Sequence, residues 1–218
     1  MTLQSDSYPS SRYAFNMTIG ALATVVSWLA TAAHAHSGTG LAGGVQSGFL
    51  HPLNGPDHML AMVSVGLWGA ILGRPLVIAL PVVFPAMMAI GGVLGILGMP
   101  MPPVEIGIAT SVIILGAVIA AALRPPAFVA VTLVGIFALF HGYAHGQELP
   151  SAADPVGYSL GFVLSTGLLH LVGVGLGFLL LQRVGLTSLR VTGAVVGLIG
   201  LWFLSQTDFL PRMTNLLS

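Results

Sequence analysis

The sequence predicts an all-α integral membrane protein, a polytopic bundle of about six membrane-spanning helices that follows a cleavable signal peptide. Composition gives the first indication, because 56% of the 218 residues are hydrophobic and only 6% are charged. An ordinary soluble domain has roughly 25% charged residues. The mean hydropathy of +0.98 agrees with a membrane protein. The second indication is a series of apolar runs, each near the roughly 20 residues that a spanning helix needs.

Charge and cysteine content exclude several classes of function. The chain has no lysine and a formal net charge of zero. It therefore lacks the basic surface that nucleic-acid binding requires. Cysteine is also absent, which excludes disulfides, thiolate catalysis and soft-ligand metal centres. The seven histidines are the strong nitrogen ligands that remain for a metal ion.

Residues 1–35 have the order of a secretory signal peptide: a polar start with Arg12, an apolar run, and small residues before a cleavage site. Cleavage is expected after Ala33 or after Ala35. The apolar run is also long enough for an uncleaved helix, which is the alternative. Residues 36–218 are expected to form a single transmembrane domain.

Cleavage after Ala33 would leave His34-Ala35-His36 as the new terminus. A free amine, two backbone amides and the imidazole of His36 would then surround one ion in the square-planar arrangement that suits Ni(II) or Cu(II). The alternative is that these histidines of the cleavage region have no function.

The apolar runs downstream are Leu76–Gly98, Val104–Leu123, Ala127–Phe140, Val156–Leu181 and Leu186–Leu204. The segment before them, Gly40–Leu72, is too long for one straight crossing. If it nevertheless crosses once, the arginines at positions 74, 124, 183 and 190 all face the cytoplasm, as the positive-inside rule requires. Glu105, Glu148, Asp154 and Asp208 then all face outside. We therefore expect six crossings with both mature ends external.

The first crossing is expected to be broken within His51–Pro56. Pro52 and Pro56 lack amide donors and clash with the preceding turn, while Asn54 and Gly55 favour a turn and can cap a helix that restarts at Pro56. Backbone freed from helical bonding is tolerated in a membrane only where protein or water satisfies it. Discontinuous helices of this kind often mark the substrate site of a transporter.

The broken segment carries His51, Asp57 and His58 in the pattern H-x5-D-H. Imidazole suits Ni, Co, Cu and Zn, and a carboxylate lowers the positive charge of a divalent ion as it leaves water. A turn can fold the three side chains toward one point, and Asp57 can also orient an imidazole through its other nitrogen. The alternative is structural, with the histidines and Asp57 capping the broken helices. We favour function, because ionisable residues within a membrane span are costly.

The second motif, FHGYAHGQE, places His141, His145 and Glu148 on one face of a helix, where they can ligate or relay one ion. Gly142 and Gly146 either allow close backbone approach or loosen the helix end. A lone mid-span histidine, at position 170, is as compatible with helix packing as with metal ligation.

Enzyme and haem-protein functions have weaker support in the sequence than metal binding by the two histidine motifs. A zinc protease would need H-E-x-x-H, and the H-x3-H of His141 and His145 lacks the glutamate. Nothing marks Ser47, near His51, as an activated nucleophile. The sequence therefore favours a protein that is not an enzyme. A membrane-embedded haem protein with His170 as one axial ligand remains the alternative, and a Soret band would reveal it.

The sequence strongly resembles the HupE/UreJ family of nickel/cobalt permeases. The resemblance rests on HPLNGPDH at 51–58, FHGYAHGQE at 140–148 and the HAHSGTG that follows the signal-like start. It implies a multi-pass permease of the bacterial plasma membrane that imports Ni²⁺ or Co²⁺ as substrate and holds no resident cofactor. It also implies a supply of metal to hydrogenase, to urease or to cobalamin synthesis. The functional positions that it suggests are His51, Asp57, His58, His141, His145 and Glu148.

The chain has no nucleotide-binding motif, so transport is expected to be passive or coupled to an ion gradient. We expect the ion to meet the histidine-bearing terminus, pass Glu148, His145 and His141, and lose water at His51, Asp57 and His58. Because three crossings separate the two motifs, a 3+3 inverted repeat is expected. The sequence is compatible with a homo-oligomer, and the same ligands accept Ni²⁺ and Co²⁺.

Overall fold

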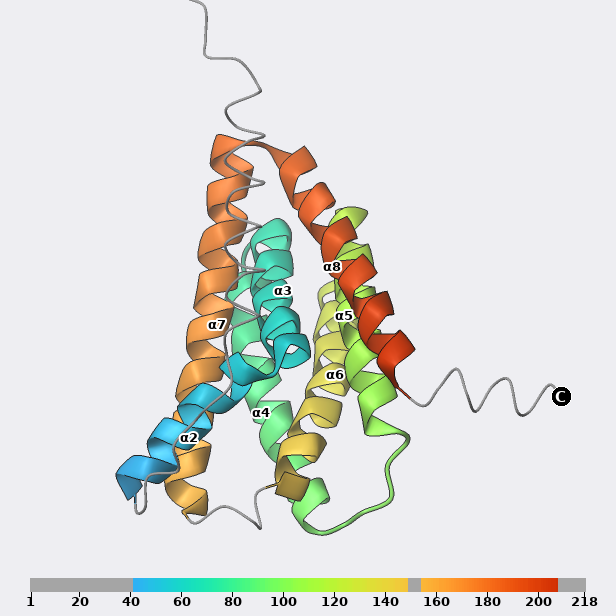
Figure 1. Cartoon of the computed structure of the whole chain (residues 1–218). Helices are drawn as coiled ribbons and strands as arrows, with labels where there is room; N and C mark the ends of the chain where they lie inside the picture. The colour runs from blue at the N-terminus through green and yellow to red at the C-terminus, as the bar shows by residue number, and fades with distance from the viewer. Residues whose placement is uncertain (1–40, 149–153, 208–218) are drawn as a thin grey trace, which may run out of the picture. The chain divides into compact units, whose positions relative to one another are not determined.

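A computed structural model of the chain describes residues 41–148 and 154–207. Within these ranges all regular structure is helical, as the sequence predicts (Figure 1). The expected signal peptide, with His34 and His36, lies outside the described residues. The helices of the described part are α2 (Leu41–Asn54), α3 (Pro56–Leu72), α4 (Leu76–Ile96), α5 (Val104–Ala120), α6 (Ala127–Glu148), α7 (Pro155–Arg183) and α8 (Leu186–Gln206).

The first crossing consists of two helices, α2 and α3, as predicted. Gly55 separates them and has the extended backbone angles φ −94° and ψ 96°. Pro56 is the first residue of α3, a position where its missing N–H costs no helical hydrogen bond. Pro52 lies within α2, two residues before the end of that helix. The helix therefore continues past this proline, and the break occurs at Gly55. Figure 1 shows α2 at a steep angle to α3.

The other helices make this a multi-pass membrane protein. α4, α6, α7 and α8 are long and apolar enough to cross a membrane, while α3 and α5 are shorter apolar helices of 17 residues each. The predicted ends are close to the observed ones, except that α6 continues past Phe140 to Glu148 and includes the whole second motif. Large apolar side chains lie exposed on the outer helices, as lipid-facing positions would, for example Val82, Phe128, Leu171 and Leu198.

The arginines of the described residues lie at one end of the helical bundle. Trp68 near the end of α3 donates a hydrogen bond to the carbonyl of Leu123 at 3.0 Å, and Arg190 near the start of α8 donates one to the carbonyl of Ala120 at 2.9 Å. These bonds join the end of α3 and the start of α8 to the end of α5. The same end carries Arg74, Arg124 and Arg183, whereas Glu105, Glu148 and Asp154 lie at the opposite end.

Glycines bring the backbones of neighbouring helices close together. Gly142 on α6 lies against the backbone of Met88 on α4, and Gly146 lies against that of Gly92 one turn further on. Helices in lipid associate through close packing of small residues, because burial of apolar side chains gives little driving force there. The glycines of the second motif therefore serve close approach between α4 and α6.

The helix pairing has the pattern that a 3+3 inverted repeat requires. The first crossing packs along α7, α4 packs along α6, and α5 packs along α8. If the first three crossings are exchanged with the last three, the pair of the first crossing with α7 becomes the pair of α6 with α4. The pair of α5 with α8 stays the same. The contact of α3 with α5 has no counterpart of similar extent between α6 and α8 in the described residues. The repeat itself stays a prediction.

Candidate metal site

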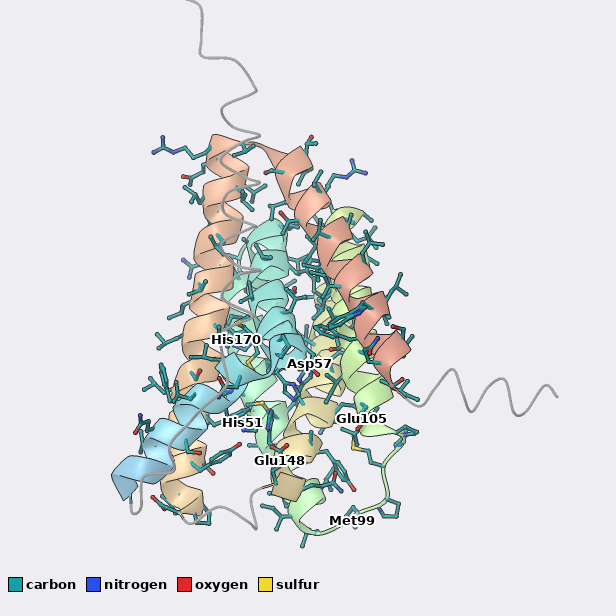
Figure 2. All side chains as sticks on the ribbon, in the orientation of Figure 1. His51, Asp57, Met99, Glu105, Glu148 and His170 are labelled. Carbon is teal, nitrogen blue, oxygen red and sulfur yellow. The ribbon has the colours of Figure 1, made fainter. Side chains whose placement is uncertain are left out.

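Helices α2, α3 and α6 bring the two histidine motifs together at one place in the bundle (Figure 2). His51 lies in the last turn of α2, and Asp57 and His58 lie in the first turn of α3. His141 and His145 lie in the C-terminal part of α6, one turn apart. The break in the first crossing thus ends one helix and starts the next beside α6.

Four imidazoles form a continuous row, which we call the histidine row, in the order His51, His145, His58, His141. Successive ring centroids are 4.7, 4.6 and 4.7 Å apart, and the rings meet edge to face. The side chain of His51 is 34% exposed, those of His145 and His58 are 8% and 13% exposed, and His141 is fully buried. The row therefore runs from the surface into the core of the bundle.

Glu148 lies at the outer end of the histidine row. Its Oε2 atom is 3.1 Å from Nε2 of His51 and 3.5 Å from Nδ1 of His145. The three potential ligand atoms lie within 4.8 Å of one another, so one ion can be reached by all three side chains. Two imidazoles and a carboxylate form a donor set that suits divalent nickel, cobalt, copper or zinc.

Asp57 holds the imidazole of His58. Its Oδ1 atom accepts a hydrogen bond from the backbone N–H of His58 at 2.9 Å and lies 2.8 Å from Nδ1 of the same residue. A carboxylate at Nδ1 favours the proton on that nitrogen and leaves Nε2 with a free lone pair, as in many metal sites where a carboxylate orients a histidine. Nε2 of His58 is buried and has no hydrogen-bond partner among the described residues. The orienting role considered for Asp57 thus has the geometry it needs.

His141 is the innermost member of the row. Its Nε2 atom lies 3.1 Å from the hydroxyl of Ser111 on α5, and its Nδ1 atom is buried without a hydrogen-bond partner in the described residues. Phe84 on α4 packs against the ring at 5.6 Å. This histidine is therefore held by α4 and α5 as well as by its own helix.

His170 on α7 lies outside the histidine row. It is fully buried, and its ring packs on Phe84 with centroids 5.1 Å apart. Because Phe84 also contacts His141, it joins His170 to the inner end of the row. The packing role has a visible partner in Phe84.

A cleft of about 950 Å³ gives access to both carboxylates of the site. It lies between the start of α5 and the ends of α6 and α8, at the end of the bundle opposite the arginines. Asp57, His58 and Glu148 line it, together with Glu105 and Gln147. Hydrated ions can therefore approach the middle of the row as well as its outer end.

The arrangement differs from the sequence-based prediction in one respect. His51, Asp57 and His58 were expected to converge on one point, with His51 at the inner end of the ion path. His51 instead contacts Glu148 at the outer end, because His145 of α6 lies between His51 and His58 in the row. The two motifs interleave and do not form separate clusters.

Several residues at the site were missed by sequence reasoning because they belong to neither motif. Ser111 contacts His141, while Phe162 packs against His145 at 4.2 Å and Tyr158 against His51 at 5.6 Å. Tyr158 and Phe162 are four residues apart on α7, a helical spacing that is common in any apolar helix. No local signal distinguishes these positions, so only the packing of α5 and α7 on the motifs reveals them.

Comparisons with known proteins match most of the chain. The chain matches the family described as HupE / UreJ protein over residues 23–203. It is 43% identical over 185 residues to "Protein HupE" of Rhizobium leguminosarum bv. viciae, and the match covers 84% of this chain and 97% of the relative. No solved structure matches it. The chain therefore belongs to the HupE/UreJ family.

Proposed function

We propose that this protein is a secondary, ATP-independent transporter that imports Ni²⁺, Co²⁺ or both across the bacterial plasma membrane. The observation that carries the proposal is the histidine row, which leads from His51, whose side chain is about one-third exposed, to fully buried His141. Four imidazoles in contact within a membrane bundle are costly unless they serve a function. A row of similar ligands about 5 Å apart gives an ion successive binding positions, as multi-site conduction needs.

The ligand chemistry supports a transition metal as the cargo. Imidazole nitrogens suit nickel, cobalt, copper and zinc, whereas magnesium and calcium prefer oxygen ligands. The row offers no thiolate, which suits a site that must also release its ion. All four metals accept imidazole ligands, so the ligands alone do not select among them. The choice of nickel and cobalt rests on the family resemblance.

The sidedness of the charges supports the direction of transport. The arginines of the described residues lie at one end of the bundle, and the positive-inside rule places that end in the cytoplasm. The cleft and Glu148 then face outside, where the ion enters. The ion would exchange its water for Glu148, His51 and His145, and then move to His58 and His141.

Release to the cytoplasm requires the inner end of the row to open. The break at Gly55 makes α2 and α3 separate helices, so one can turn against the other without breaking a continuous helix. The imported metal would supply hydrogenase, urease or cobalamin synthesis, as the family resemblance implies. A homo-oligomer is compatible with this function.

Uptake of radioactive Ni²⁺ at nanomolar concentration into cells that express the chain tests the proposal. We expect uptake that Co²⁺ inhibits and Mg²⁺ does not, and that is lost in His145→Ala, because His145 contacts the residues on both sides of it in the row. The matched control is Phe128→Ala on the same helix, where the side chain is 72% exposed. Equal uptake in the two variants, at equal membrane abundance, would reject the histidine row as the transport site.

A further inference from the structure

Ser111 lies on α5, thirty residues before His141, and is fully buried. Its hydroxyl oxygen is 2.6 Å from the carbonyl oxygen of Ile108 and 3.1 Å from Nε2 of His141. We propose that Ser111 is a positioning residue that holds His141 in the tautomer protonated on Nε2, so that its Nδ1 lone pair serves the transported metal. The metal part of this inference rests on the proposed function.

The argument begins with the single proton of the Ser111 hydroxyl. Two oxygen atoms 2.6 Å apart need a proton between them, since this distance lies in the short part of the range for O–H···O hydrogen bonds. The carbonyl of Ile108 has no proton to give, so Ser111 donates to it. The hydroxyl can then only accept from His141, and Nε2 of that ring must carry the hydrogen.

The surroundings of Nδ1 of His141 favour the same tautomer. This nitrogen is buried, and no hydrogen-bond acceptor for it is present among the described residues. A proton on Nδ1 would create a buried, unsatisfied N–H group, which is unfavourable because that group has lost its hydrogen bonds to water. It would also place two lone pairs, those of Nε2 and the hydroxyl oxygen, against each other. Both consequences disappear when the proton is on Nε2.

The result is a pair of neighbouring histidines that each keep one ring nitrogen free. Asp57 accepts a hydrogen bond from Nδ1–H of His58, which leaves Nε2 of that ring unprotonated. Ser111 accepts a hydrogen bond from Nε2–H of His141, which leaves Nδ1 of that ring unprotonated. The two rings are 4.7 Å apart and nearly perpendicular. Each histidine thus has one nitrogen held by the protein and one free for metal, the pattern by which outer hydrogen bonds fix the tautomer of metal-binding histidines.

Nitrogen-15 NMR of histidine-labelled, metal-free protein in lipid nanodiscs tests the tautomer directly, with the His141 signals identified by their loss in His141→Gln. We expect a protonated Nε2 and an unprotonated Nδ1 in the wild type, a mixture in Ser111→Ala, and recovery of the wild-type spectrum in Ser111→Thr, which keeps the hydroxyl. Ser64→Ala is the matched control, because Ser64 is equally buried but its hydroxyl has no partner in the described residues. A wild-type ring protonated on Nδ1, or an unchanged spectrum in Ser111→Ala, would overturn the proposal.

Nickel binding to the same samples tests the functional part. Loss of the outer partner of a metal-binding histidine typically weakens affinity by about 10–100-fold. We expect a loss in that range for Ser111→Ala and recovery in Ser111→Thr; full affinity in Ser111→Ala would remove any role in metal binding. If the wild type shows the expected tautomer but binds no nickel, the proposed function fails while the assignment of Ser111 as the partner that fixes the tautomer is supported.

Discussion

Replacing Gly142 by alanine tests whether backbone contact between α4 and α6 sets the position of the histidine row. A Cβ atom at this position would lie 2.7 Å from the backbone carbonyl carbon of Met88, whereas ordinary contacts begin at 3.4 Å. Neither atom can rotate away, because one is backbone and the other is bonded directly to it. The carbonyl oxygen of Met88 would lie closer still, so the two helices must separate by at least about 0.7 Å, the difference between these distances, and α6 carries the adjacent His141 with it.

A displacement of this size is large on the scale of metal coordination, where ligand distances hold to about 0.2 Å. We expect uptake from nanomolar nickel to fall at least about tenfold in Gly142→Ala, which corresponds to about 1.4 kcal/mol. Overpacking of a closely packed contact should also lower stability by about 1–3 kcal/mol. The two effects are separable, because uptake is measured per unit of protein in the membrane.

The matched control is Gly175→Ala on α7, where the added Cβ meets nothing within 4 Å. Both variants make the same chemical change inside a membrane helix, so helix propensity and side-chain size are held constant. Radioactive nickel uptake and the thermal unfolding midpoint in detergent are measured for both. Wild-type uptake and stability in Gly142→Ala would refute the reasoning, since α4 and α6 would then not be in the contact described.

Three further predictions follow from the site and its orientation. Asp57→Asn removes the charge that orients His58 and should lower nickel affinity about 10–100-fold; an unchanged affinity in equilibrium binding would reject that role. Glu148→Gln should raise the nickel concentration needed for half-maximal uptake more than it lowers the maximal rate, because Glu148 lies at the exposed end of the row; a fall in maximal rate alone would contradict capture at that end. The chain has no cysteine, so single cysteines can report topology. In intact spheroplasts, a membrane-impermeant maleimide should label Pro102→Cys and should label Pro126→Cys only after permeabilisation; the reverse pattern would invert the proposed orientation.

Local chemistry was sufficient to predict most of the fold. Proline has no amide donor, and Asn54 and Gly55 favour a turn, so the break in the first crossing could be placed within His51–Pro56, and it occurs at Gly55. Apolar runs of spanning length predicted the later helices. The apolar run of α6 was placed only as far as Phe140, because the histidines and Glu148 lower the hydropathy after it, yet the helix continues to Glu148. Hydrogen bonding within the helix and packing on α4 hold that segment, and hydropathy does not measure either.

The sequence by itself determined the membrane class, the break and the residues able to bind a metal, because each of these depends on residue type and on spacing along one helix. Only the tertiary structure decided which histidines are neighbours. The order His51, His145, His58, His141 alternates between the first crossing and α6, and no spacing along the chain contains that information. The same holds for Ser111, whose contact with His141 comes from the packing of α5. Contacts between separate helices depend on how their backbones approach, and in this bundle glycines set that approach.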